Sequence, residues 1–188
     1  MVSLAQLWLP IVVAAIGIFA ASSIVHMVLQ FWHRPDYHKF SNEDEVRAAI
    51  RKGSPAPGMY MVPYCPPETM KDPATLQKFT EGPVGFMIVR ANGVFNMGKS
   101  LGQWFAFCLL AAVFAGYLGS ITLPAGDAPM HVFRVITTVG LMAFGFGTLP
   151  MVIWYGQPWK AASKDLVDAL LYSLVMAAVF MWLWPHAV

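Results

Sequence analysis

The stretch that decides the fold is Leu101–Leu123, LGQWFAFCLLAAVFAGYLGSITL, which contains no charged residue. At 1.5 Å of rise per residue, a helix of this length crosses a hydrocarbon core of about 30 Å. Three other stretches are similar, and the four predicted transmembrane helices are 7–30, 101–123, 132–155 and 166–184. The sequence therefore predicts an all-α polytopic membrane protein with one sizeable insert, residues 31–100, between its first two helices.

The basic residues predict how the chain is oriented. Nine of the twelve Lys and Arg lie in 31–100, two more are Lys160 and Lys164, and Arg134 lies just inside the third helix. None lies in the remaining non-helical segments, 1–6, 124–131 and 185–188. Because short loops rich in Lys and Arg stay in the cytoplasm, we expect a bacterial inner-membrane protein with a cytoplasmic insert and both termini in the periplasm.

The insert has the pattern of a small α/β layer. We expect a helix from an N-cap at Ser41 to Lys52 and a short helix from Asp72 to Phe79. The apolar runs 59–64 and 84–89 favour strands, and pairing between them is the first choice. So small a layer buries little core by itself. It should therefore lean on the membrane helices or on a partner, and docking a partner is the second choice for the Pro-rich tract 57–67.

Small residues mark where the helices pack. In 101–123 they form two rows with a spacing of four, which lets two helices approach closely. The predicted helix-packing interface is Ala111, Ala112, Ala115, Gly116, Gly119 and Ser120. Packing inside the chain's own bundle explains most of this pattern, and two adjacent rows could also lie at a contact between subunits.

Motifs for catalysis or for an organic cofactor are missing. The chain has no nucleophile elbow, P-loop, dinucleotide fingerprint or H-E-x-x-H motif. His26, His33 and His38 belong to one continuous stretch, which cannot supply axial haem ligands from opposite faces of the porphyrin. Cys65 and Cys108 are expected in different environments and unpaired. We therefore predict no enzyme activity, no catalytic residue and no cofactor.

A metal site remains open as a hypothesis, with candidate ligands His33, Asp36, His38 and Cys65. The H-x4-H spacing with an Asp between offers suitable ligand types, but it matches no common zinc pattern. Solvated interfacial side chains with ion pairs to their basic neighbours are the simpler interpretation.

The carboxylates of the fourth helix are assigned a structural role. Asp165 and Asp168 are expected in its first turn, near the positive end of the helix dipole, with Ser163 as a possible N-cap. No ionisable group lies near the centre of any predicted span. This weakens a proton- or sodium-coupled transporter.

These observations favour a non-catalytic membrane protein, an accessory or structural subunit of a larger inner-membrane complex. Its expected partners are membrane lipid and other membrane subunits or a second copy of itself, but not nucleic acid. The alternative is a small homo-oligomeric channel or transporter, lined by polar residues within the spans: Tyr117, Thr137, Thr138 and Ser173. A membrane enzyme that uses the region of His33 and Cys65 ranks last.

Overall fold

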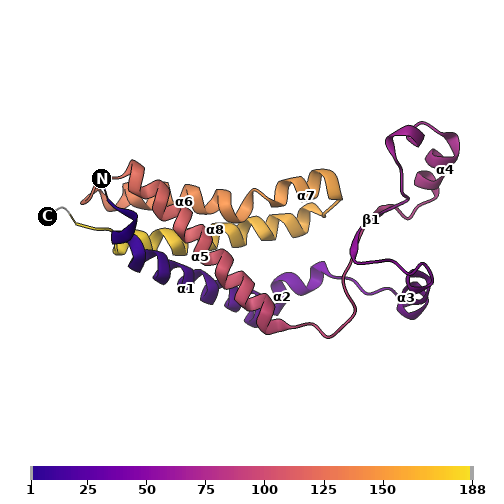
Figure 1. Ribbon diagram of the computed structural model, residues 1–188, viewed down its shortest axis with the longest axis horizontal. Helices are drawn as coiled ribbons and strands as arrows, with labels where there is room; N and C mark the ends of the chain where they lie inside the picture. Colours follow the sequence, from indigo (N-terminus) through magenta and orange to yellow (C-terminus); the bar gives the residue numbers. More distant parts are fainter. Residues whose placement is uncertain (1, 187–188) are drawn as a thin grey trace. The chain divides into compact units, whose positions relative to one another are not determined.

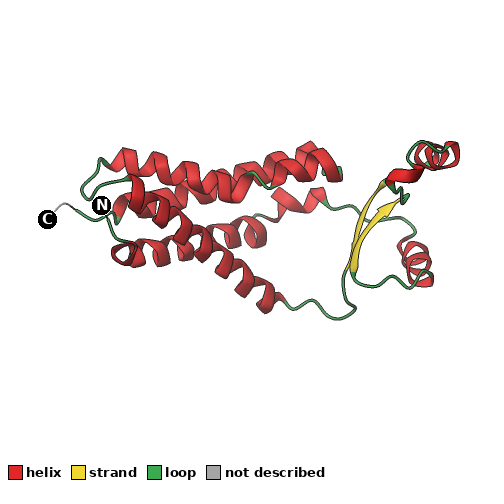
Figure 2. Cartoon of the chain, turned by 45° about the horizontal axis from the view of Figure 1, so that its top comes forward, coloured by secondary structure: helices red, strands yellow, loops and turns green. Residues whose placement is uncertain are grey.

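The computed structural model describes residues 2–186, and the chain divides into two compact units. Within the described residues, the first unit comprises 2–36, 96–152 and 157–186. The second unit comprises 37–95 together with 153–156. The first is the helical bundle, and the second contains the sheet shown in yellow in Figure 2.

The described residues contain four helical segments long and apolar enough to cross a membrane: Leu4–Val28, Met97–Thr122, Pro129–Tyr155 and Trp159–Trp182. The prediction of four helices of membrane-spanning length is therefore confirmed. Two of the segments are not continuous α-helices. The α-helices of the four segments, labelled in Figure 1, are α1 (Trp8–Ser23), α5 (Met97–Thr122), α6 (Pro129–Gly145), α7 (Thr148–Tyr155) and α8 (Trp159–Trp182).

The bundle is held by close contacts between α1, α5, α6 and α8. Helix α6 lies along α8, and α1 contacts both α5 and α8 (Figure 1). Gly116 of α5 leaves room for Ile11 and Phe180, and Gly140 of α6 lies against the backbone of Ser173. Helices that pack in lipid gain little from hydrophobic burial, so such small residues set the distance of approach.

The first segment changes its winding near its end. After α1 the chain forms one π-helical turn, Ile24–Val28, in which the Leu29 amide donates to the carbonyl of Ile24. The backbone of Leu29 (φ −86°, ψ 52°) leaves the helix, and α2 (Gln30–His33) follows. The membrane-length segment therefore ends at Val28, two residues before the predicted end at residue 30. The short helix α2 then extends into residues that were expected to belong to the insert.

The fourth helix begins earlier than expected. Helix α8 starts at Trp159 with Pro158 as its N-cap, and the Ser163 hydroxyl donates to the carbonyl of Lys160 inside the helix. The prediction of Ser163 as N-cap and of Asp165 and Asp168 in the first turn is wrong. Nothing in Trp159–Asp165 breaks a helix, since the stretch contains neither Pro nor Gly.

The second unit contains a two-stranded antiparallel sheet, β1 (Gly58–Val62) with β2 (Gly85–Val89), and two short helices, α3 (Glu43–Lys52) and α4 (Pro73–Glu81). The predicted strand pairing is confirmed, with Met61 opposite Phe86. Asp72 occupies the N-cap position of α4 as expected, although its side chain accepts no capping hydrogen bond, whereas α3 begins after Asn42 and not after Ser41.

Replacing Gly140 by Ala should destabilise the bundle. A Cβ at Gly140 would lie 3.0 Å from the Cα of Ser173 and 2.6 Å from the terminal methyl of Met176. We expect G140A to lose roughly 1–3 kcal/mol of unfolding free energy, as overpacked sites do. Unfolding of the detergent-solubilised protein with increasing SDS measures this.

Gly102 is the matched control, because a Cβ there meets nothing within 4 Å. We expect G102A to be neutral or to stabilise α5 by up to about 1 kcal/mol, since Ala favours helix. Equal losses in both variants would show that α6 and α8 do not approach closely at Gly140.

Candidate functional site

One polar cluster interrupts the apolar bundle, and its central group is Asp168 on α8. The side chain of Asp168 is only 7% exposed. Its Oδ1 accepts a hydrogen bond from Trp32 Nε1 at 2.9 Å, and its Oδ2 lies 2.6 Å from His33 Nε2. A carboxylate taken out of water needs such partners, because an uncompensated buried charge is very costly. The cluster therefore joins the chain after α1 to α8.

A second carboxylate, Asp36, extends the cluster. Lys164 Nζ donates to Asp36 Oδ1 at 2.6 Å and to the carbonyl of Trp32, also at 2.6 Å. The hydrogen bond and charge of Lys164 hold the pKa of Asp36 below its usual range, and these outweigh the opposing effect of burial. Residues 32–36 are thus held against α8 by two of its charged side chains, Lys164 and Asp168.

Two histidines complete the cluster on the side of α1. The rings of His26 and His33 stack with their centroids 4.6 Å apart. His26 Nε2 lies 3.2 Å from the Tyr172 hydroxyl and 3.8 Å from Asp168 Oδ2. Among residues 2–186, His26, His33 and Asp168 form the one group of three whose potential metal-ligand atoms all lie within 4.8 Å of one another.

The four metal candidates from the sequence do not gather as one set. His33 Nδ1 lies 3.5 Å from Asp36 Oδ2, so these two are neighbours. His38 is exposed beside Phe40 and Val46, and the Cys65 thiol lies near the carbonyl of Pro66, both in the second unit. The cluster instead includes His26 and Asp168. Their contact depends on packing between helices far apart in sequence, which spacing along the chain cannot reveal.

The residues of the predicted helix-packing interface are all buried inside this chain's bundle: Ala111, Ala112, Ala115, Gly116, Gly119 and Ser120. Gly116 faces Ile11 of α1 and Phe180 of α8, while Gly119 faces Trp184 and Ile136. Both small-residue rows are therefore occupied by the chain's own helices.

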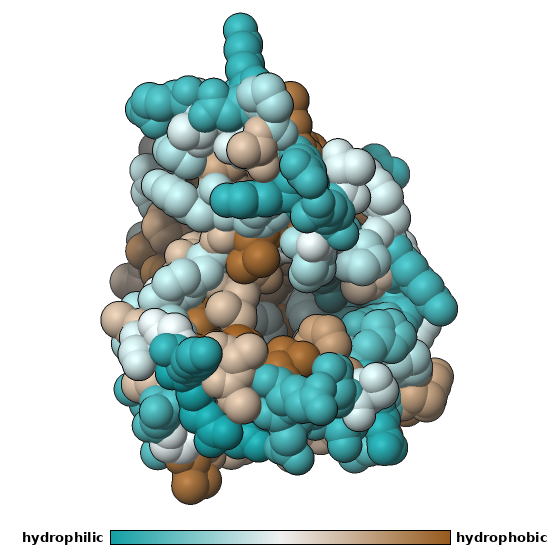
Figure 3. Space-filling model, turned by 90° about the vertical axis from the view of Figure 1, so that its right-hand side faces the viewer, coloured by the Kyte–Doolittle hydropathy of each residue, from teal (hydrophilic) through white to brown (hydrophobic). Residues whose placement is uncertain are grey.

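The second unit offers a different kind of surface, an apolar sheet face. Met59 and Met61 of β1 pair across the sheet with Ile88 and Phe86 of β2, so all four side chains share one face. Met59 is 62% exposed and Ile88 66%. On the side of the molecule shown in Figure 3, apolar residues (brown) lie exposed among polar residues (teal).

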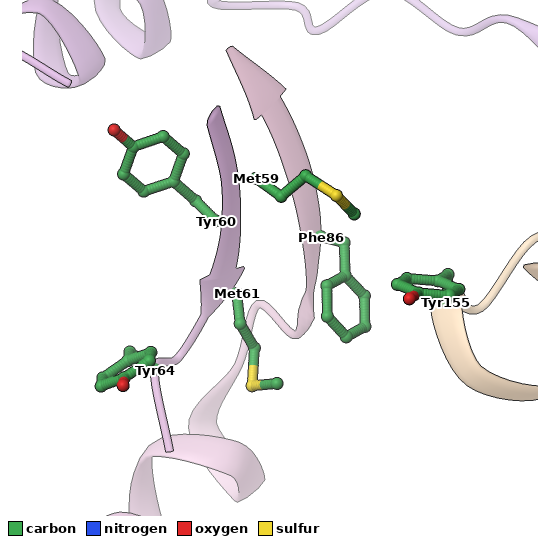
Figure 4. Close-up of a pocket in the computed structure, with 6 residues that line it drawn as sticks. All are labelled: Met59, Tyr60, Met61, Tyr64, Phe86 and Tyr155. Atoms are coloured by element: carbon green, nitrogen blue, oxygen red, sulfur yellow. The ribbon is translucent and has the colours of Figure 1, made fainter. Parts of the chain in front are cut away.

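The same face borders a hollow of about 480 Å³, shown in Figure 4. Met59 and Phe86 point toward Tyr155, which belongs to the same compact unit, and the rings of Phe86 and Tyr155 meet edge to face at 5.2 Å. Tyr60 points to the opposite side of the sheet. The lining is mostly apolar, so the hollow suits an apolar side chain better than a polar metabolite.

Comparison of the chain with protein-family models, with curated proteins and with solved structures gives no match. The functional proposals below therefore depend on geometry and chemistry.

Removing the indole N–H of Trp32 should weaken the cluster without deleting its bulk. In Trp32→Phe the carboxylate of Asp168 loses a charge-assisted hydrogen bond, which typically contributes about 1.5–3 kcal/mol. We expect a lower midpoint in thermal unfolding of the detergent-solubilised protein.

Trp182→Phe is the control, because Trp182 is 75% exposed near the opposite end of α8. Its substitution should change the midpoint little. Equal effects of the two substitutions would mean that the bond to Asp168 contributes nothing measurable.

Proposed function

We propose that the protein is a non-catalytic accessory subunit of a larger complex in a bacterial inner membrane. In this proposal, the helical bundle anchors the second unit, which docks on another subunit of the complex. The observation that carries the proposal is the burial pattern of the second unit. Not one of its residues from 37 to 95 is buried, although many are large and apolar.

The lack of a core has a direct physical consequence. A folded unit is stabilised mainly by the apolar area it removes from water, and an unburied unit gains little of that energy. The face formed by Met59, Met61, Phe86 and Ile88 is an apolar surface of the kind that marks interaction sites. Methionines at such a surface adapt to the shape of a partner.

Charge favours a protein partner over a lipid surface for this face. Residues 37–95 carry seven Lys and Arg against six Asp and Glu, so the net charge is close to zero. Binding to anionic lipid is typically driven by clusters of four to eight basic residues. Because positive and negative charges nearly cancel in this unit, it is not strongly attracted to anionic lipid. Burial of its apolar sheet face against a protein needs no net charge.

The bundle supports an anchoring role better than a channel. The hydroxyls of Thr138 and Ser173 donate to carbonyls of their own helices, those of Arg134 and Ala169. Ser173 is also fully buried against α6, so it lines no path between subunits. Tyr117, a third residue considered for a polar path, is half-exposed on the surface of the bundle.

The orientation follows from the distribution of Lys and Arg. We place residues 37–95 and the Lys160–Lys164 region in the cytoplasm, and the connection at Gly126 in the periplasm. The chain itself is consistent with this, because the Gly126 amide donates to the carbonyl of Pro185 near the end of the chain, while Lys164 contacts Asp36 at the insert. The terminal residues 1, 187 and 188 lie outside the described residues.

An Ile88→Glu substitution tests the docking face. We expect the variant to insert into the membrane normally. The amount of other subunits that co-purify with it should fall at least about tenfold, since a buried unpaired carboxylate costs several kcal/mol. Native mass spectrometry after mild detergent extraction from the native membrane measures the stoichiometry.

Val94→Glu is the matched control, because Val94 is 99% exposed in the same unit and outside the sheet. It should retain the wild-type set of subunits. A wild-type protein that purifies as a clean homo-oligomer would overturn the accessory-subunit proposal, as would full retention of partners by the Ile88→Glu variant.

Cysteine labelling tests the orientation. In a Cys65→Ser background, where the remaining Cys108 is fully buried, Ser54→Cys and Ala128→Cys each add one exposed thiol. A membrane-impermeant maleimide should label position 128 in intact spheroplasts and position 54 only in inverted vesicles. The reverse pattern would contradict the proposed topology.

A further inference from the structure

We propose that His26, His33 and Asp168 form a three-ligand site for a divalent transition-metal ion, with zinc as the first choice. The donor set is two imidazole nitrogens and one carboxylate oxygen, all within 4.8 Å of one another. This combination is typical of open zinc sites and of the facial triads that bind iron(II). The inference is independent of the docking face, which lies in the other unit.

The backbone brings the two histidines together in an unusual way. In a regular α-helix, residues seven positions apart are separated by about 10.5 Å along the axis. Here the π-helical turn Ile24–Val28 and the break at Leu29 intervene, and the two rings lie 4.6 Å apart. π-Helical turns are rare, and those that interrupt α-helices are frequently found at functional sites. The same break places His33 over α8, where it meets Asp168.

Two of the three distances between ligand atoms lie near those around a bound ion, and the third is at most 4.8 Å. Around a tetrahedral zinc ion with Zn–N bonds of about 2.0–2.1 Å, ligand atoms lie roughly 3.3 Å apart. The observed distances from Asp168 Oδ2 are 2.6 Å to His33 Nε2 and 3.8 Å to His26 Nε2, so one is shorter and one is longer than the distance around a zinc ion. An ion would take the place of the proton between His33 and Asp168.

Groups around the three ligands have the arrangement that supports metal binding. A histidine that binds metal through Nε2 donates its Nδ1–H, most often to a carboxylate or carbonyl. Asp36 Oδ2 lies 3.5 Å from His33 Nδ1, and this oxygen is buried and makes no hydrogen bond within the described part of the chain. Asp168 is oriented in turn by Trp32.

A hollow reaches the site at one of its three ligands, His26. A hollow of about 280 Å³ between α1 and α5 is lined by His26, Ser22 and Trp104 among others, and half of the His26 side chain is exposed. Three protein ligands and an accessible fourth position distinguish open zinc sites from closed structural ones. Water or a small ligand could therefore complete the coordination.

The competing explanation needs no metal. A protonated His33 placed between the carboxylates of Asp36 and Asp168 would neutralise the cluster together with Lys164. In that case His26 is not a metal ligand, and its replacement removes only its stacking on His33 and its contacts with Tyr172 and Asp168. The two explanations differ in whether the protein binds one metal ion per chain and in whether His26 is required.

The test uses the full-length protein in detergent, treated with a chelator and then titrated with Zn²⁺ or Co²⁺. We expect one ion per chain by mass spectrometry of the metal content. The Co²⁺ form should show visible absorption of low-coordinate cobalt, and the metal content of protein isolated from its native membrane distinguishes zinc from iron.

His26→Ala is the decisive variant, since His26 is half-exposed and its loss should leave the bundle folded. We expect it and His33→Ala to weaken binding at least about tenfold and to change the cobalt spectrum. Asp36→Asn should weaken binding about 10–100-fold, as changes to outer-shell partners do. Circular dichroism identifies any variant that fails to fold.

His131→Ala is the matched control. His131, in the first turn of α6, also forms a pair with an aspartate, Asp127, at 2.9 Å, but away from the cluster around Asp168. It should bind metal like the wild type. Absence of stoichiometric binding by the wild type, or unchanged affinity and spectrum in the folded His26→Ala variant, would overturn the proposal.

Discussion

Close approach between helices is the constraint on which this structure depends. In a membrane, lipid competes with every apolar contact, so association relies on tight packing and on hydrogen bonds between helices. Gly116 admits Ile11 and Phe180, and Gly140 lets α6 lie directly against α8 at Ser173. With these contacts made, the bundle buries a continuous core from Leu7 to Trp184.

Among residues 2–186, that packing also places a buried carboxylate, Asp168, inside the bundle. Helix α8 continues through Lys164 and Asp168 because no Pro or Gly interrupts it after Pro158. Both side chains then face the chain that follows α1, where Asp36, Trp32 and His33 satisfy them. The cluster stabilises this junction, and the same donor groups are those that a transition metal prefers.

The two units have opposite relations to their surroundings. The bundle satisfies its packing and its buried polar groups mainly by itself, as the hydrogen bonds from Trp104 to Ser22 and from Trp32 to Asp168 illustrate. The unit of residues 37–95 leaves its apolar sheet face uncovered and buries none of its residues. The proposed role, a membrane anchor for a unit that docks on a partner, is based on this contrast.

The number of membrane-length helices, the packing role of the small-residue rows in 101–123 and the pairing of two strands in the insert could all be predicted from the sequence. These features depend on composition and on local periodicity, which are readable along one chain. Only the tertiary structure showed that His26, His33 and Asp168 come together, because 135 positions separate His33 from Asp168. The π-turn at Ile24–Val28 was not predicted either, because no residue pattern in that stretch was recognised as marking one.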